Sequence, residues 1–143
     1  MSNFSERLAE LMFENNDIKS EQLGNELGIS GATIRRWQSG NQEILLSNLI
    51  KLADYFNCSI DFLAARTENK LDFLPLPCPP FYNAFRSALE ANKITRYRFT
   101  KETRFKDPFF TKWKKSADPH IQTLIEISNY LDISIDCLVG RDK

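Results

Sequence analysis

The sequence has few of the residues that build metal sites, disulfide frameworks or membrane spans. Its three cysteines are widely spaced without a Cys-x-x-Cys pair, and its one histidine, His120, has no cysteine nearby. This pattern argues against structural zinc or a disulfide framework and is typical of a reducing cytosol. No apolar run approaches the roughly 18 residues that a membrane span needs, and Glu6 and Glu10 are untypical of a signal peptide. We therefore expect no metal, no cofactor and no membrane association.

The marks of an enzyme are missing as well. No phosphate-binding glycine loop is present, and no Ser or Cys nucleophile motif stands near His120. A catalytic site needs a concave pocket with converging groups, whereas units of about 65 residues barely fill their own cores. The sequence therefore predicts a protein that is not an enzyme, with no catalytic residues and no small-molecule ligand.

The net charge of zero conceals an uneven distribution. Residues 1–66 contain six Lys and Arg against nine Asp and Glu, whereas residues 80–143 contain twelve against eight. The C-terminal part is thus net basic, and what this means for binding depends on where the charges lie on the fold.

An internal repeat organises the chain. Apolar positions recur at an offset of 76 residues and, after one deletion near residue 117, at an offset of 75. The aligned pairs include Ile18 with Ile94, Trp37 with Trp113, Tyr55 with Tyr130, Asp61 with Asp136 and Arg66 with Arg141. Because these are mostly core positions, helix caps and turns, the tandem repeat predicts two copies of one architecture with divergent surfaces.

A proline-rich segment, LDFLPLPCPP at residues 71–80, separates the copies and holds four of the six prolines. Proline excludes a helix there and favours an extended, semi-rigid spacer. Its apolar side chains are expected to pack on one or both copies, with the Leu74 and Leu76 amides protected from exchange. The predicted domains are therefore residues 1–68 and 81–143, joined by a linker at residues 69–80.

Five short helices are predicted in each copy, and no strand-like alternation competes, so the fold class is all-α. The apolar residues among positions 4–12 follow the spacing of one buried helical face. In the first copy the predicted caps and ends are Ser20, Gly28, Ser30, Gly40 and Ser59, with the fifth helix ending near Arg66. In the second copy they are Thr95, Asp107 with Pro108, Asp118 with Pro119, Ser134 and Gly140.

The second and third predicted helices of the first copy form a helix-turn-helix. Two helices of about eight residues joined by a three-residue glycine turn suit a unit whose second helix enters the major groove of B-DNA. Ile29, Ile34 and Trp37 are expected to point inward. The outer surface would then carry Ser30, Gly31, Ala32, Thr33, Arg35 and Arg36.

The stretches LGNELGISGATIRRWQSG at residues 23–40 and LIKLADYFNCSIDFLAAR at residues 49–66 resemble the Xre/Cro/lambda-repressor family of bacterial and phage helix-turn-helix regulators. The resemblance covers roughly residues 4–66 without internal gaps. It implies a five-helix domain that binds double-stranded operator DNA, commonly as a dimer, to repress or activate transcription.

Carried over by position, the resemblance implies base contacts along the third helix and phosphate contacts around it. A helix N-terminus favours phosphate at Ser20, and Arg36 can bond a guanine edge with two donors. Family members often carry a long polar side chain where this sequence has Gly31 and Ala32, so specificity would rest more on Thr33 and the arginines. The implied base-contacting residues are Ser30, Gly31, Ala32, Thr33, Arg35 and Arg36, and the implied phosphate-contacting residues are Ser20, Ser39 and Asn41.

The second copy contains YLDISIDCLVGR at residues 130–141, which resembles the same family, but Arg104 replaces the turn glycine. Nine basic residues against two acidic ones lie between Lys93 and Lys115. Three readings stay open: base reading by both copies, sequence-independent phosphate contact by the second, or an apolar surface for dimerisation or another protein, formed by Phe81, Tyr82, Phe85 and Phe109. Under the DNA readings the contacting residues are Arg96, Arg98, Lys106, Phe109, Lys112, Lys114 and Lys115.

We therefore expect a cytoplasmic, nucleoid-associated regulator of bacterial or phage type that binds double-stranded DNA, with repression as the favoured sign. The alternative is a protein-binding adaptor or antitoxin-like partner protein whose second copy mediates dimerisation or partner binding. Homodimerisation, the operator and the regulated genes are left open.

Overall fold

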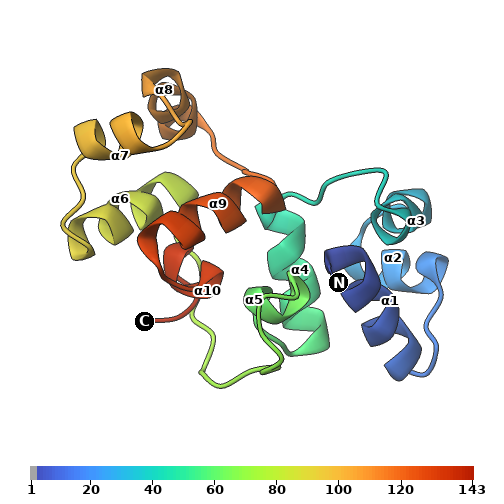
Figure 1. Cartoon of the computed structure of the whole chain (residues 1–143). Helices are drawn as coiled ribbons and strands as arrows, with labels where there is room; N and C mark the ends of the chain where they lie inside the picture. Colours follow the sequence, from blue (N-terminus) through green and yellow to red (C-terminus); the bar gives the residue numbers. More distant parts are fainter. Residues whose placement is uncertain (1–2) are drawn as a thin grey trace. The chain divides into compact units, whose positions relative to one another are not determined.

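The computed structural model describes residues 3–143, and this range contains ten helices and no β-strand (Figure 1). The all-α class expected from the sequence is confirmed. The chain divides into two compact units, the first ending at Asp72 and the second beginning at Phe73. None of the described helices combines the length and the hydropathy that a membrane crossing requires.

The first unit contains five helices around one apolar core. They are α1 (Phe4–Glu14), α2 (Ser20–Leu27), α3 (Gly31–Ser39), α4 (Leu46–Phe56) and α5 (Ile60–Leu63). Each contributes at least one side chain with no exposed surface: Leu8, Leu23, Ile34, Leu49 and Ile60 in chain order. The helical periodicity of the apolar residues therefore predicted the buried faces.

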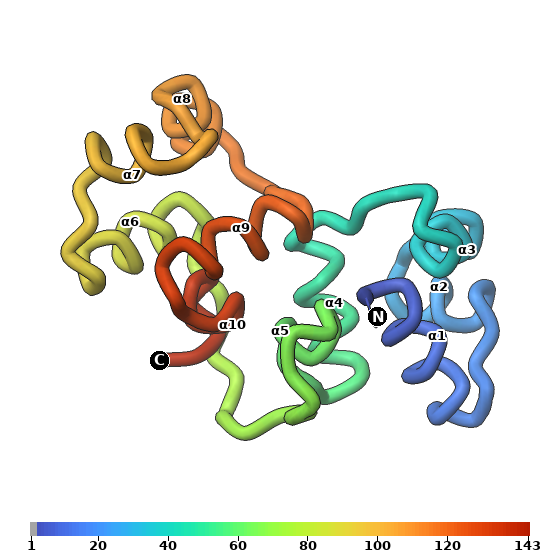
Figure 2. The backbone as a smooth tube through the Cα atoms, viewed as in Figure 1, coloured from blue at the N-terminus to red at the C-terminus, as the bar shows by residue number. Residues whose placement is uncertain are grey.

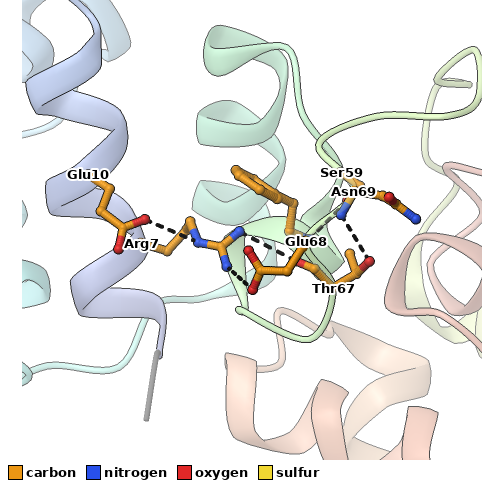
Figure 3. A network of polar contacts seen from close by, with 7 residues as sticks. Arg7, Glu10, Ser59, Thr67, Glu68 and Asn69 are labelled. Atoms are coloured by element: carbon orange, nitrogen blue, oxygen red, sulfur yellow. Dashed lines mark hydrogen bonds and ion pairs between the residues drawn. The ribbon is translucent and has the colours of Figure 1, made fainter.

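A buried arginine ties the two ends of the first unit together (Figure 3). The Arg7 side chain is 3% exposed, and its guanidinium lies 3.9 Å from the centroid of the Phe62 ring. Its Nη1 donates to the Thr67 carbonyl at 3.4 Å, and its Nη2 donates to a Glu68 carboxylate oxygen at 3.2 Å. Because a buried cation is stable only with such partners, α1 is held against the segment that follows α5.

The second unit also contains five helices, which Figure 2 follows along the backbone. They are α6 (Phe81–Ala91), α7 (Arg96–Glu102), α8 (Asp107–Lys115), α9 (Ile121–Leu131) and α10 (Ile135–Leu138). Around α6 to α8 the core is aromatic: the centroid of the Phe85 ring lies 5.2 Å from that of Phe99, 5.5 Å from that of Phe110 and 5.3 Å from that of Trp113.

The inward packing of α6 removes the apolar surface that one reading of the sequence assigned to a partner. Phe85 has no exposed surface and Phe81 is 3% exposed, while Tyr82 is half-buried. Phe81 stacks on Phe85 and meets Trp113 edge-on, with centroids 5.7 and 5.5 Å apart. The expected surface of Phe81, Tyr82, Phe85 and Phe109 is therefore wrong, because the i, i+4 face of α6 forms the core.

Part of the proline-rich segment is tied to the end of the second unit. The Leu76 amide donates to the Arg141 carbonyl at 2.8 Å. Pro79 covers Gly140 so closely that a Cβ on the glycine would lie 2.7 Å from the proline ring. Leu74, in contrast, is 86% exposed. The segment thus packs through its backbone at Leu76, and the expected packing of the Leu74 side chain is wrong.

Four of the predicted helix caps are confirmed and three are displaced. Ser30, Ser59, Thr95 and Ser134 each accept a bond from the amide three residues onward. The cap of α2 is Lys19 rather than Ser20, because the extended Lys19 backbone places its amide against Gln22 Oε1 at 3.1 Å. The caps of α8 and α9 are Lys106 and His120, one and two residues from the predicted Asp107 and Asp118, and α5 ends at Leu63 rather than near Arg66.

Candidate nucleic-acid interface

A tight turn sets α3 against α2. Gly28 ends α2 with φ +71°, the left-handed conformation that glycine adopts without strain. The Ser30 Oγ accepts from the Thr33 amide at 3.1 Å and so begins α3. Gly24 lets the turn pass close to α2, since a Cβ there would lie 2.2 Å from the Ile29 carbonyl oxygen. The glycines and the serine together fix where the second helix of the helix-turn-helix starts.

The inner face of α3 is anchored in the core. Ile34 has no exposed surface and Trp37 is 1% exposed, and the Trp37 ring meets Phe4 edge-on with centroids 6.4 Å apart. The Ser5 hydroxyl donates to the Trp37 carbonyl at 2.5 Å, which also accepts from the Gly40 amide at 3.3 Å, so α1 contacts the C-terminus of α3. The predicted inward orientation of Ile34 and Trp37 is confirmed, whereas Ile29 is half-buried.

The outer face of α3 carries the residues that the sequence assigned to bases. Their exposure is uneven: Ser30, Arg35 and Arg36 are exposed, Ala32 and Thr33 are half-buried, and Gly31 is buried. The Glu21 carboxylate covers Gly31, because a Cβ on this glycine would lie 2.3 Å from Glu21 Oε1. The face therefore includes a carboxylate from α2 that the sequence analysis missed.

The two arginines of this face differ in charge compensation. Arg35 Nη1 lies 2.8 Å from Glu21 Oε1, and both side chains are more than half exposed. Arg36 instead donates from Nε to the Gln42 side-chain carbonyl at 2.8 Å, and no carboxylate pairs with it within residues 3–143. Arg36 thus keeps its full charge, while that of Arg35 is neutralised. The only sign in the sequence that Arg35 and Arg36 differ in charge compensation was Glu21, at the start of α2.

The three predicted phosphate-contacting residues lie at the ends of α2 and α3. The Ser20 hydroxyl donates to the Gln38 side-chain carbonyl at 3.0 Å and so joins the start of α2 to the end of α3. The Ser39 hydroxyl donates to the Arg36 carbonyl at 3.1 Å, and Asn41 is exposed. The fold brings the three positions to one helix pair but engages the two hydroxyls inside the protein.

The connection between α7 and α8 uses no glycine. The Thr103 hydroxyl donates to the Phe99 carbonyl at 2.7 Å and accepts from the Phe105 amide at 3.2 Å. The Lys106 ammonium donates to the Thr103 carbonyl at 2.8 Å and also to the Thr100 carbonyl. Side chains thereby satisfy the last carbonyls of α7, where α2 relies on a glycine turn. Lys106 is consequently engaged with its own unit.

All three arginines of residues 93–115 are paired within the second unit. Arg96 Nε lies 3.1 Å from Asp107 Oδ1, and Arg98 Nε lies 3.0 Å from Glu102 Oε1. Arg104 Nη2 lies 2.6 Å from Glu126 Oε2. Glu126 belongs to α9, outside residues 93–115, whose composition had suggested a strong positive charge. The fold therefore lowers the net charge of this face below the value read from residues 93–115.

A hydrogen bond to Tyr130 tunes the Glu102 carboxylate. The Tyr130 hydroxyl donates to Glu102 Oε1. This bond, with a smaller contribution from Arg98, lowers the pKa of Glu102 below its ordinary value of 4.5. Burial, and then the same bond, raises the pKa of Tyr130 above 10.0. Both shifts favour a charged Glu102 beside a neutral Tyr130 near pH 7.

Lysines at the end of α8 remain uncompensated. Lys112, Lys114 and Lys115 are exposed, and in the described part of the chain none of them has an ion-pair partner. Phe109 is half-buried, with its ring centroid 5.2 Å from that of Phe105 and 5.5 Å from that of Trp113. It therefore packs at the edge of the aromatic core, and the lysines supply the exposed charge.

An open hollow of about 290 Å³ adjoins these lysines and is lined in part by Arg104, Lys112 and Trp113. Between residues 3 and 143, no cluster of three or more His, Cys, Asp or Glu side chains could hold a metal ion.

Residues 11–63 match a family model described as helix-turn-helix, of the Xre/lambda-repressor-like kind. The matched range ends at the last residue of α5, includes α2, the glycine turn and α3, and lies within the first unit. No curated protein and no solved structure matches the chain. The matched family consists of DNA-binding regulators that are typically not enzymes. The helix-turn-helix of residues 11–63 therefore suggests a DNA-binding regulator.

Proposed function

We propose that this chain is a sequence-specific transcriptional regulator that places α3 in the major groove of double-stranded DNA. The observation that carries the proposal is the division of α3 into two faces. Ile34 and Trp37 are fixed in the core, whereas Arg36 is exposed without a carboxylate partner in the described chain. A guanidinium presented from a rigid helix can donate two bonds to guanine O6 and N7, and the family match supports this use.

The remaining residues of the site have supporting roles in this proposal. Thr33 and Ala32 offer a hydroxyl and a methyl group to base edges, and Ser30 stands at the helix start. Ser20, Ser39 and Asn41 lie at the ends of α2 and α3, where backbone amides would approach the sugar-phosphate backbone, since the two serine hydroxyls donate within the protein. Such contacts fix the register of the helix, while α3 reads the sequence.

The proposal extends to residues 73–143 as a second, divergent copy with a phosphate-binding role. Its helices have 11, 7, 9, 11 and 4 residues, against 11, 8, 9, 11 and 4 in the first unit. Arg96, Arg98 and Lys106 are engaged within the unit. The charges that remain uncompensated are those of Lys112, Lys114 and Lys115 on α8, and they favour phosphate contact without base reading. We propose domains at residues 1–68 and 81–143 joined by residues 69–80, of which residues 73–80 belong to the second compact unit.

Repression is the proposed sign of regulation. A protein that occupies a promoter site excludes other proteins from it, and this needs no chemistry beyond DNA binding. A cytoplasmic location follows from the same proposal, since bacterial and phage operators lie there. The regulated genes would be identified by the sequence that the protein selects.

The test is selection of bound duplexes from a random pool at low salt, followed by binding measurements on the selected site. Arg36→Ala should reduce the preference at one base pair by roughly tenfold, the loss of one bidentate contact. Lys70→Ala is the matched control: it removes one positive charge from the same unit beside Glu14 and Tyr55, away from α3. The proposal is wrong if no duplex is enriched or if Arg36→Ala leaves the preference profile unchanged.

A further inference from the structure

A carboxylate occupies the recognition face at the place where α3 begins. Glu21 is the second residue of α2, and its side chain is 70% exposed. Its Oε1 lies where a side chain at position 31 would otherwise stand, 2.3 Å from the Cβ that Gly31 lacks. Gly31 has no left-handed backbone conformation, and a larger side chain at this position would require the movable Glu21 carboxylate to shift.

Stability alone does not account for this arrangement. Exposed ion pairs such as Glu21 with Arg35 contribute little to folding free energy because water screens them and ordering both side chains costs entropy. Glycine at the start of α3 forgoes the helix propensity of alanine. The arrangement therefore points to binding rather than to folding.

The carboxylate is unsuited to the DNA backbone. Negative charge at this place repels phosphates and blocks the α3 N-terminus as a phosphate site, and it also neutralises Arg35 at 2.8 Å. Arg35 then adds little to sequence-independent binding, unlike Arg36, whose charge is uncompensated. When DNA covers this surface the carboxylate needs hydrogen-bond donors for both of its oxygens, and Arg35 supplies a donor to Oε1 alone.

The major groove offers such donors only on bases. Cytosine presents its N4 amino group, a partner for glutamate, and its paired guanine presents O6 and N7, the partners of arginine. The acceptor of Glu21 and the donors of Arg35 lie side by side, which matches the donor and acceptors that one C·G pair presents. We propose that Glu21 is a specificity-determining residue that accepts from a cytosine N4 amino group, with Arg35 on the guanine of the same pair.

This inference rests on the proposed binding of α3 in the major groove, and its test uses full-length protein with duplexes from the selected site. Competition binding compares the selected duplex with variants that replace one C·G pair at a time by each other pair. Glu21→Gln keeps the shape of the side chain and one acceptor oxygen, but it removes the negative charge that strengthens the bond to an amino group and puts an amide donor in place of the other oxygen. Glu26→Gln is the matched control, because Glu26 is exposed on the same helix α2 and has no ion pair within residues 3–143.

Glu21→Gln should lower the preference for one C·G pair by roughly tenfold. It should also raise affinity for unrelated duplexes and increase the dependence of log K on log salt by about one unit, because the released Arg35 reaches a phosphate. Glu26→Gln should leave the preference profile and the salt slope unchanged. Thermal unfolding of both variants shows whether they are folded, as their exposure predicts.

Three results separate the possibilities. If the wild-type protein enriches a site and Glu21→Gln keeps every base preference, the role of Glu21 is overturned while the proposed function stands. If the lost preference is for an A·T pair, the partner is adenine N6 and the assignment to cytosine is wrong. If the wild-type protein enriches no sequence, the proposed function fails and the inference fails with it.

Discussion

Arg141 and Asp136 form an ion pair that is closed off from water, with 2.9 Å between Arg141 Nη1 and Asp136 Oδ1 and both side chains 1% exposed. The Arg141 amide also donates to the Asp136 carbonyl at 2.8 Å. Arg66 and Asp61 repeat this relationship in the first unit, where the side chains are 23% and 9% exposed. The same i, i+5 pair thus closes α5 and α10, at positions 75 residues apart.

Breaking the buried pair should destabilise the second unit strongly. Arg141→Met keeps much of the side-chain volume but leaves the Asp136 carboxylate without its guanidinium, and we expect a loss of about 3–5 kcal/mol in the free energy of unfolding. Arg66→Met is the matched control in the first unit and should cost less, because its pair is partly hydrated. Each unit holds one tryptophan, Trp37 or Trp113, so urea unfolding in Trp37→Phe and Trp113→Phe backgrounds follows the units separately.

A third variant isolates the cause of that loss. Replacing both partners, with Asp136→Leu and Arg141→Met together, removes the buried charge and should recover most of the stability. An Arg141→Met transition that shifts no more than that of Arg66→Met would contradict the importance of burial. A shift in the Trp37 signal alone would place the effect in the wrong unit.

Gly24 should be sensitive to the smallest substitution. The Cβ of Gly24→Ala would meet the Ile29 carbonyl oxygen at 2.2 Å, and because the obstacle is backbone, α2 and the turn must move apart. We expect a loss of about 1–3 kcal/mol despite the better helix propensity of alanine. Gly31→Ala meets only the movable Glu21 side chain and should not destabilise the unit. Urea unfolding followed by Trp37 fluorescence distinguishes the two, and equal stabilities would refute the close approach.

The lysines of α8 should contribute to the salt dependence of DNA binding. Each of Lys112→Ala, Lys114→Ala and Lys115→Ala should reduce the slope of log K against log salt by about 0.9 if that lysine contacts a phosphate, with no change in base preference. Lys143→Ala removes an exposed lysine elsewhere in the same unit and should leave the slope unchanged. A triple variant with wild-type affinity and slope would exclude a DNA role for this face.

The Glu102–Tyr130 bond should make the second unit sensitive to acid. Donation by Tyr130 holds the folded-state pKa of Glu102 below 4.5, so the stabilisation is fully present above this pH and is lost as the pH falls through the lower folded value. The urea midpoint of the wild-type protein should therefore exceed that of Glu102→Gln at pH 7, and the difference should shrink below pH 4.5. Glu90→Gln, an exposed control on α6, should show no such pH dependence.

The sequence predicted those parts of the fold that depend on interactions between residues close together in the chain. Helical periodicity and the glycine turn are properties of consecutive residues, so the buried faces and the start of α3 were predictable. The caps at Ser20 and Asp107 were misplaced because the extended residue just before each of them becomes the cap, and the cap at Asp118 was misplaced because α9 begins later, after the extended His120. Composition at a helix start does not reveal that difference.

The candidate site was predictable in position but not in its charges. Arg35 and Arg36 are adjacent in sequence and equivalent in pattern, yet only Arg35 meets the carboxylate of Glu21. In the same way Glu126 neutralises Arg104 from another helix. Pairing across helices depends on where side chains lie after folding. The charge sum over residues 93–115 therefore overstated the uncompensated positive charge on that face of the second unit.

The bond from the Leu76 amide to the Arg141 carbonyl has a practical consequence for dissecting the chain. A fragment that begins at Phe81, where α6 begins, would lack Leu76 and Pro79. Its C-terminal residues would lose the hydrogen bond to Arg141 and the contact that covers Gly140. Such a fragment would unfold at a lower temperature than the intact unit and would understate the stability of that unit. A fragment that begins at Phe73 keeps Leu76 and Pro79, so its stability better represents how well the second unit folds on its own.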